Sequence, residues 1–230
     1  MEPLADEPPS QGYYKFIAGG MDFNVTVTLR ASIVESWIRN VKKLYMDAAP
    51  IKCVGLDCEF TDHVHGRRQD PLPTEQKQRD AILQLSVASE TLVFHICRGD
   101  VVPQLLKDFL RDETIRFCGA AIHNDVRMLI PYGIEITYAV DLQTLIVNPT
   151  NNPIASLYAL ANHTISTNLE KKKKNNKKKK DKANDEEEDL TSGWGDAPLS
   201  LYRVKYAALD ARLGFEIVRK LWDAPGYIAM

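Results

Sequence analysis

Polar and hydrophobic residues alternate over two short runs near the start of the chain. The runs are YYKFIAGG (residues 13–20) and FNVTVTLR (residues 23–30). The second run puts its apolar residues on one face: Phe23, Val25, Val27 and Leu29. Two such runs separated by glycines predict a β-hairpin with one face in contact with water.

A period of three to four residues follows the hairpin and predicts a helix. Ser32 and Glu35 have the spacing of a capping box, which places the start of this helix at Ser32. Its expected buried stripe consists of Val34, Trp37, Ile38, Val41 and Leu44.

The segment IKCVGLDCEF (residues 51–60) is apolar on both of the faces that it would have as a strand. This pattern is typical of a central strand in a sheet. The polar stretch from Thr61 to Arg79 is expected to be a loop, and two more apolar strands follow it, at residues 81–88 and 91–97.

Helical and strand patterns alternate in the remainder of the chain. The last helix is expected from about Pro198 to Trp222, with Asp196 as its N-cap. Strands that first follow one another and then alternate with helices predict an α/β fold. We expect a mixed β-sheet flanked by helices on both faces.

One segment interrupts this pattern, EKKKKNNKKKKDKANDEEED at residues 170–189. It is basic and then acidic, and it has too few apolar residues to join a core, so we expect a disordered insertion. A phosphate-binding arm and a nuclear localisation signal remain open alternatives. The acidic, proline-rich residues 1–12 are expected to be a disordered lead, which leaves residues 13–230 as one domain.

Composition adds limits to this picture. The 230 residues, 44% of them hydrophobic, suffice for one buried domain, and the net charge of −2 requires any nucleic-acid contact to come from a local basic surface. No apolar run approaches the ~18 residues of a membrane span. We therefore expect no membrane partner and an intracellular protein, in the nucleus and/or the cytoplasm. The cysteines stand singly in apolar segments, which is typical of reduced core thiols: Cys53, Cys58, Cys97 and Cys118.

Two acids stand at the end of the predicted central strand. Because side chains alternate along a strand, Asp57 and Glu59 share one side and Cys58 points to the other. A divalent cation is the usual means of holding two carboxylates so close together. The same spacing also occurs by chance, as Asp185 and Glu187 show, so the pair alone does not define a site.

Three further residues could complete such a site. Asp125 follows an apolar strand, at the edge of the sheet where α/β proteins place their sites, although it could also be a helix N-cap. Tyr206 and Asp210 are four residues apart on the last helix and share one face of it. A buried Asp210 needs a partner, which is either a metal or a salt bridge to Arg212 or Lys205.

The order of these residues resembles the DEDD superfamily of 3′–5′ exonucleases, specifically its tyrosine subgroup, which has a ribonuclease H-like fold. The resemblance extends from about Ile51 to Leu221 and includes AILQLSV, CGAAIHNDVRML, DLQTL and SGWGDAPLSLYRVKYAALDA. These segments are similar to the exonuclease domain of Werner-syndrome-type proteins and ribonuclease D. The histidine subgroup would carry a histidine at the position of Lys205. Relatives often carry glutamine at the position of Arg203.

The resemblance implies a hydrolase that removes nucleotides from the 3′ end of single-stranded or recessed nucleic acid. It further implies a two-metal mechanism with Mg²⁺ or Mn²⁺. Asp57 would contact both ions, Glu59 and Asp210 would complete the first site, and Asp125 would hold the second. Tyr206 would donate a hydrogen bond to the attacking water. These five residues are the expected catalytic set.

Contacts with the nucleic acid are less specified by the sequence. Phe60 is a candidate stacking platform, although it could equally be a core residue. The choice between DNA and RNA stays open. The alternative function is a catalytically weak nucleic-acid-binding or protein-interaction adaptor that keeps the exonuclease fold. The candidate phosphate contacts, each of which could instead be a solvated surface residue, are Arg67, Arg68, Arg127 and Arg203.

Overall fold

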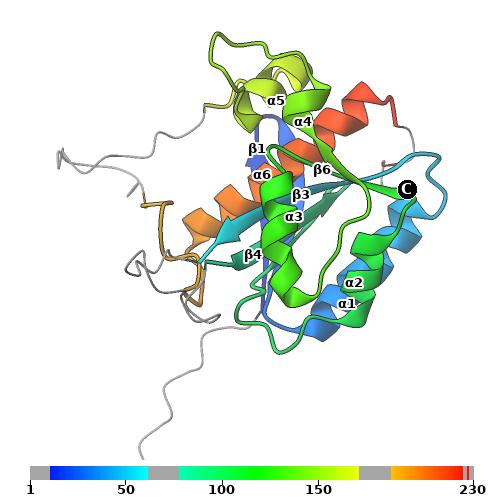
Figure 1. The fold of residues 1–230 in the computed structure, drawn as a ribbon, viewed down its shortest axis with the longest axis vertical. Helices are drawn as coiled ribbons and strands as arrows, with labels where there is room; N and C mark the ends of the chain where they lie inside the picture. The colour runs from blue at the N-terminus through cyan, green and yellow to red at the C-terminus, as the bar shows by residue number, and fades with distance from the viewer. Residues whose placement is uncertain (1–10, 62–77, 171–187, 225–226, 228–230) are drawn as a thin grey trace, which may run out of the picture.

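A seven-stranded mixed β-sheet forms the centre of the computed structural model, which describes residues 11–61, 78–170, 188–224 and 227 (Figure 1). The strands lie in the order β1-β2-β5-β4-β3-β6-β7. The pairs β2–β5, β3–β6 and β6–β7 are parallel and the other three are antiparallel, which confirms the predicted mixed sheet. The strands are β1 Gln11–Ala18, β2 Met21–Thr28, β3 Lys52–Phe60, β4 Asp80–Val87, β5 Glu90–Phe94, β6 Ile115–Gly119 and β7 Ala139–Asp141.

Helices cover both faces of this sheet, as predicted. The long helix α6 packs against β3 and β4, with α5 beside it, and α1, α2 and α3 lie on the other face (Figure 1). Among the described residues, no helix combines the length and the apolar composition that crossing a membrane requires. The helices are α1 Ala31–Val41, α2 Gln104–Arg111, α3 His123–Leu129, α4 Leu142–Leu145, α5 Leu157–Ile165 and α6 Leu201–Leu221, with a π-helical turn η1 at Lys42–Met46 and a 3₁₀ turn η3 at Ile130–Tyr132.

Backbone contact holds α6 against the centre of the sheet. A Cβ atom at Gly55 of β3 would lie 2.0 Å from the carbonyl oxygen of Ala211 and 2.6 Å from the amide nitrogen of Phe215. Only glycine can therefore occupy this position without moving the helix. This approach fixes where α6 presents its side chains over the end of β3.

The start of α1 differs from the prediction. The helix begins at Ala31 with Arg30 as its N-cap residue, and Ser32 and Glu35 do not form a capping box. The first free amide, that of Ala31, instead donates a hydrogen bond of 2.8 Å to Oδ1 of Asp100. A side chain from a distant segment thus caps the helix, and local spacing carries no signal of it.

The far end of the same helix also differs. Leu44, predicted to be buried, is 57% exposed, whereas Tyr45 and Met46 are buried. The π-helical turn at Lys42–Met46 inserts one extra residue into the turn and rotates the following side chains relative to the α-helical stripe.

The start of α6 is a third difference. The helix begins at Leu201, and its N-cap is Ser200, whose hydroxyl accepts a hydrogen bond from the amide of Arg203. The prediction of Asp196 as the N-cap, with the helix starting at about Pro198, was wrong. Ser200 is itself a favoured N-cap residue, and it lies closer to the first apolar turn.

The segments predicted to be disordered lie mostly outside the described residues. Gln11 and Gly12, expected in the lead, belong to β1. The predicted loop after β3 is described only at its ends, where the amide of Thr61 donates to the carbonyl of Arg79 at 2.8 Å. Residues 171–187 of the charged segment lie outside the described residues, whereas Glu188 and Asp189 are described and make contacts reported below.

Candidate metal centre and active site

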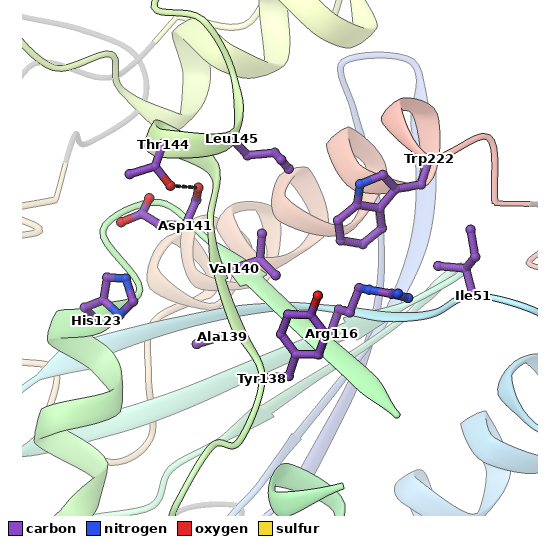
Figure 2. Close-up of a pocket in the computed structure, with 10 residues that line it drawn as sticks. All are labelled: Ile51, Arg116, His123, Tyr138, Ala139, Val140, Asp141, Thr144, Leu145 and Trp222. Atoms are coloured by element: carbon purple, nitrogen blue, oxygen red, sulfur yellow. Dashed lines mark hydrogen bonds between the residues drawn. The ribbon is translucent and has the colours of Figure 1, made fainter. Parts of the chain in front are cut away.

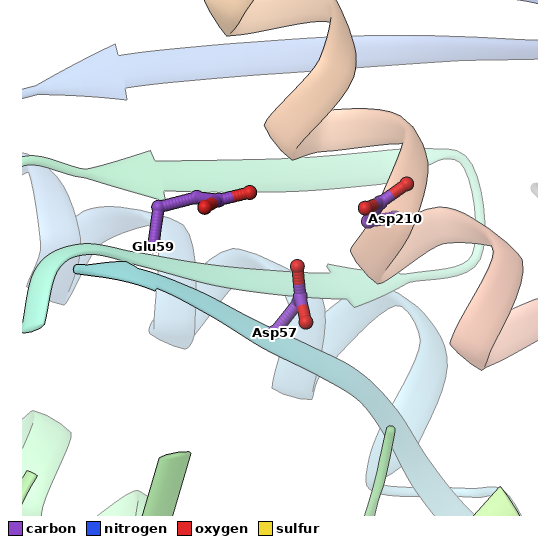
Figure 3. Close-up of side chains that lie close together, drawn as sticks. All are labelled: Asp57, Glu59 and Asp210. Atoms are coloured by element: carbon purple, nitrogen blue, oxygen red, sulfur yellow. The ribbon is translucent and has the colours of Figure 1, made fainter. Parts of the chain in front are cut away.

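Three carboxylates from two elements meet at the end of β3. Asp57 and Glu59 point to the same side of this strand, and α6 brings Asp210 over them (Figure 3). One oxygen from each of the three lies within 4.8 Å of the others. The alternation of side chains along β3 supplies the first pair, and the close approach at Gly55 positions the third acid.

The electrostatics of this cluster favour a cation. Burial is the main cause that raises the pKa of Asp57 well above its ordinary value, and the charges of Asp210, Asp125 and Glu59 raise it further. Carboxylates in such a group cannot all be ionised at neutral pH without positive charge between them. Hard oxygen donors in this number suit Mg²⁺ or Mn²⁺.

Asp125, predicted as a fourth ligand, lies beside this group and not within it. It is the third residue of α3, so it is not the N-cap, and it is 5% exposed. Its Oδ2 has no hydrogen-bond partner among the described residues. Burial, with the nearby charges of Asp80 and Glu59, raises its pKa to about 8. A buried carboxylate oxygen without a partner, next to three other acids, fits the donor set of a second cation.

Two tyrosines face Asp210. Tyr206 lies one turn before it on α6, as predicted, and Tyr158 reaches it from α5; both hydroxyls hydrogen-bond to its carboxylate. Burial and the neighbouring acids raise the pKa of both phenols, which are therefore protonated at neutral pH and act as donors. Arg212, one of the alternative partners considered for Asp210, pairs instead with Glu216 at 2.6 Å.

Sequence reasoning did not identify Tyr158 or Gln84 as parts of this site. Gln84 of β4 lies directly opposite Asp57 in the antiparallel pair, so its side chain is on the face of the acids. Its amide is fully buried, and neither its nitrogen nor its oxygen has a hydrogen-bond partner among the described residues. The signal that could have found it is a glutamine inside the apolar run AILQLSV.

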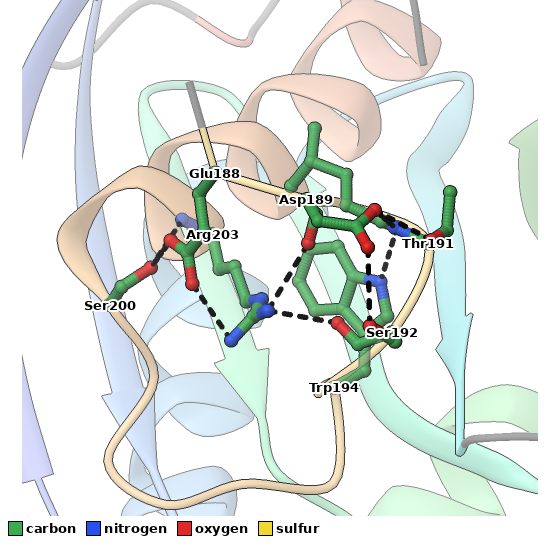
Figure 4. A network of polar contacts seen from close by, with 8 residues as sticks. Glu188, Asp189, Thr191, Ser192, Trp194, Ser200 and Arg203 are labelled. Atoms are coloured by element: carbon green, nitrogen blue, oxygen red, sulfur yellow. Dashed lines mark hydrogen bonds and ion pairs between the residues drawn. The ribbon is translucent and has the colours of Figure 1, made fainter. Parts of the chain in front are cut away.

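Trp194 connects Tyr206 to the segment before α6. The two rings lie 6.1 Å apart between centroids, and the guanidinium of Arg203 lies 5.8 Å from the centre of the Trp194 ring. Arg203 also donates to the carbonyl oxygens of Ser192 and Asp189 at 2.9 and 3.2 Å (Figure 4). These contacts fix Trp194 against Tyr206.

An ion pair completes this network. Nη1 of Arg203 lies 2.9 Å from Oε1 of Glu188, and the other carboxylate oxygen of Glu188 accepts from the hydroxyl of Ser200, the N-cap of α6 (Figure 4). The side chain of Arg203 is only 12% exposed. The structure therefore places this predicted phosphate contact largely inside the protein, where its Nη1 and Nη2 atoms bind the chain itself.

The other predicted substrate contacts differ in position. Arg127 is exposed in the last turn of α3 and donates to Oδ1 of Asn124 at 2.6 Å. Phe60 is partly buried against the core, beside a register shift between Glu59 and Phe60. Arg67 and Arg68 lie outside the described residues.

The four cysteine thiols are not part of the acid cluster. All four cysteines are free, and the expected core location is confirmed for Cys53, Cys58 and Cys118, whereas Cys97 is half-buried. Cys58 points to the opposite face of β3 from the acids, towards Asp80. Burial raises the pKa of Asp80 to about 8.

Comparison with known proteins gives a consistent result. The family described as 3′–5′ exonuclease matches residues 30–224. The chain is 27% identical over 176 residues to human exonuclease 3′–5′ domain-containing protein 2, covering 75% of this chain and 25% of that protein. It is 29% identical over 150 residues to the mouse bifunctional 3′–5′ exonuclease/ATP-dependent helicase WRN, covering 64% of this chain and 10% of that protein.

A solved structure shares the fold. Escherichia coli RNase D superposes with a TM-score of 0.62 at 18% identity, over 88% of this chain and 45% of that chain. The chain spans less than half the length of the curated relatives that it matches.

Proposed function

The chain belongs to the 3′–5′ exonuclease family, and from this membership we propose that it shortens single-stranded or recessed nucleic acid from the 3′ end with two divalent cations. The observation that supports this proposal is the group of three carboxylates within 4.8 Å, with Asp125 beside it. Bound Mg²⁺ or Mn²⁺ would supply positive charge to the attacking and leaving oxygens of the phosphodiester.

The acids divide into two sets in this proposal. Asp57, Glu59 and Asp210 would hold the first cation, because their oxygens already lie together. Asp57 and Asp125 would hold the second. The protein contributes a rigid strand and a closely packed helix, so that little rearrangement is needed when the cations bind.

Tyr206 has the role of a positioning donor. Its phenol is protonated at neutral pH and its hydroxyl lies at Asp210, on the face of the acids. We assign it the orientation of the attacking water, with Tyr158 as a second hydrogen-bond donor to the Asp210 carboxylate. Arg203 and Trp194 orient the Tyr206 ring and contact no substrate.

We propose the substrate contacts among residues that neighbour the acids in sequence. Arg127 is exposed on the helix that carries Asp125, and Arg67, Arg68 and Phe60 flank the end of β3 in sequence. We keep these four as candidate contacts to phosphate and base. An intracellular location, in the nucleus or the cytoplasm, and one exonuclease domain over residues 13–230 stay part of the proposal.

The experiment that tests the function uses 5′-labelled single strands and recessed duplexes of DNA and RNA. With Mg²⁺ or Mn²⁺, we expect a ladder of products that shorten from the 3′ end, and chelation should abolish it. Internal fragments without a ladder, or cleavage that survives the chelator, would refute the proposal. Nucleic-acid binding without any metal-dependent turnover would instead support the adaptor function.

A further inference from the structure

A cavity lies at the β7 edge of the sheet. It has a volume of about 690 Å³ and lies between β6, β7, α4 and the end of α6 (Figure 2). Its polar lining groups come from Arg116, His123, Asp141 and Thr144, and its aromatic ones from Tyr138 and Trp222.

Arg116 is held in this cavity between two aromatic rings. Its guanidinium carbon lies 5.4 Å from the ring centre of Tyr138 and 5.4 Å from that of Trp222 (Figure 2). No described residue forms an ion pair or a side-chain hydrogen bond with its guanidinium. A half-buried cation that is oriented by its neighbours and has no anionic partner is suited to binding an anion.

The carboxylate of Asp141, which also lines the cavity, is not the partner of Arg116. Oδ1 of Asp141 accepts from the backbone amides of Ala121 and Gln143, at 3.1 and 2.9 Å, so this carboxylate is held by the main chain. It faces the end of the cavity near His123, as Figure 2 shows, while Arg116 lies towards Trp222. The cavity therefore has its positive charge at the end away from Asp141.

The position of Arg116 relates the cavity to the acid cluster. Arg116 pairs with Cys53 in the parallel β3–β6 register, and Asp57 lies four residues further along β3 on the same face. Four residues of a parallel strand span roughly 13 Å. Because α6 covers this face of β3 at Gly55, a strand that runs from the acids to Arg116 has to follow the β7 edge of the sheet, so its path is longer than this separation.

We propose that this cavity binds a backbone phosphate of the substrate strand, upstream of the 3′ end that lies at the acids. This inference rests on the proposed exonuclease function. His123, two residues before Asp125, lines the end of the cavity nearest to the acids, so a strand leaving them can enter there. Tyr138 is 43% exposed and offers a ring surface for the adjoining base.

The test compares long and short substrates with an Arg116→Gln variant. For a 12-nucleotide strand, we expect KM to rise roughly three- to tenfold with little change in kcat, because one charged contact to the ground state and the transition state is lost. For a dinucleotide without a 5′ phosphate, whose single phosphodiester lies at the acids, both constants should be unchanged. Arg39→Gln, at an exposed arginine paired with Glu35, is the matched control and should affect neither length.

Binding gives an independent measurement. The dependence of log affinity on log salt for the 12-nucleotide strand should lose about 0.7 in slope in Arg116→Gln, the contribution of one phosphate contact to a single strand. If Arg116→Gln proves unstable, Tyr138→Leu, at an exposed position, serves as the second variant and should also weaken binding of the long strand. Inorganic phosphate and a mononucleotide, as separate arms, should bind far more weakly than the strand.

The outcomes separate the two proposals. If wild-type protein shortens both lengths and Arg116→Gln, with an unchanged unfolding curve, does so with the same KM and salt slope, the cavity does not bind the strand. An equal loss for short and long strands would also overturn the inference, because it would indicate a structural effect on the acids. If the wild-type protein shows no metal-dependent shortening at any length, the exonuclease proposal itself fails. Binding of a mononucleotide as tight as that of the strand would assign the cavity to product instead.

Discussion

The ring of Trp194 lies 6.1 Å from the ring of Tyr206, at a tilt of 42°. Trp194 comes from the segment before α6, and Tyr206 from the second turn of that helix. The contact joins the proposed water-orienting residue to the network of Arg203 and Glu188. The orientation of Tyr206 therefore depends on residues that touch neither metal nor substrate.

Removing the Trp194 ring should lower turnover by misplacing Tyr206. We expect Trp194→Leu to lower kcat roughly three- to tenfold, the rate equivalent of an aromatic contact of about 0.5–1.5 kcal/mol, with a smaller effect on KM. Steady-state kinetics with a short strand measure the split between the two constants. Trp194→Phe keeps a ring and should restore most of the rate; failure of this rescue would indicate a general structural defect.

Asp57→Asn should abolish the metal-dependent reaction, because Asp57 would contribute to both cation sites. The fold should persist, since the substitution also removes one of several repelling charges. Single-turnover cleavage at saturating Mn²⁺, alongside thermal unfolding, measures both. A measurable metal-dependent rate in this variant would contradict the proposed assignment of the acids.

Tyr206→Phe should have an intermediate effect. The substitution deletes one hydroxyl donor and keeps the ring that packs on Trp194, so we expect a roughly 10- to 1000-fold loss of turnover. Nucleic-acid binding should be unchanged, as measured by the anisotropy of a labelled strand. Full activity of Tyr206→Phe would show that its hydroxyl does not orient the water.

Deleting residues 171–187 should leave unfolding and cleavage largely unchanged, because the composition of this segment does not favour burial. The matched variant deletes residues 171–189 and so also removes Glu188, the ion-pair partner of Arg203. We expect only this longer deletion to lower the thermal midpoint and turnover. Equal effects of the two deletions would show that the Glu188 contacts are unimportant.

His95 should make the protein less stable in mild acid. It is 2% exposed, and burial, followed by the charge of Arg98, lowers its pKa to about 4. The unfolded chain takes up a proton at its ordinary pKa near 6.5 and the folded chain does not. The free energy of unfolding should therefore fall from about pH 6.5 to about pH 4, by roughly 3 kcal/mol at most.

A difference measurement isolates this contribution, because buried carboxyl groups with raised pKa values act in the opposite direction. Urea unfolding of wild type and His95→Gln between pH 4 and pH 7 should show a flatter dependence in the variant. His163→Gln, at an exposed histidine, is the control. Parallel curves for wild type and His95→Gln would contradict the assignment.

The order of the elements and the pairing of Asp57 with Glu59 could be predicted because both depend on local patterns, whereas the approach of Asp210 to this pair was implied by the resemblance to the exonuclease family. Alternation along residues 54–60 places Asp57 and Glu59 on one side of a strand, and helical spacing places Tyr206 on the face of Asp210. Each of these relations involves neighbours within one element. Small residues on the last helix indicated that it could lie close against a sheet, and the structure shows this contact between Gly55 and Ala211.

The contacts that escaped prediction join segments distant in sequence. Asp100 caps α1 from 69 residues away, and Tyr158 reaches Asp210 from another helix. Arg203 has the positive charge of a phosphate contact, but its partners are backbone carbonyls and Glu188. Only the folded loop brings these groups together. Charge alone cannot distinguish an arginine that binds substrate from one that binds its own chain.

The main-chain contact between Gly55 and Ala211 has a consequence for the choice of ion. Because no side chain lies between the strand and the helix there, the backbone spacing of β3 and α6 is fixed, and Asp57 and Asp210 can adjust to a cation only through their own side-chain torsions. Mg²⁺ binds oxygen at ~2.0–2.1 Å and Ca²⁺ at ~2.3–2.6 Å. We therefore expect this backbone contact to limit how far the two carboxylates can move apart, which favours the smaller cation.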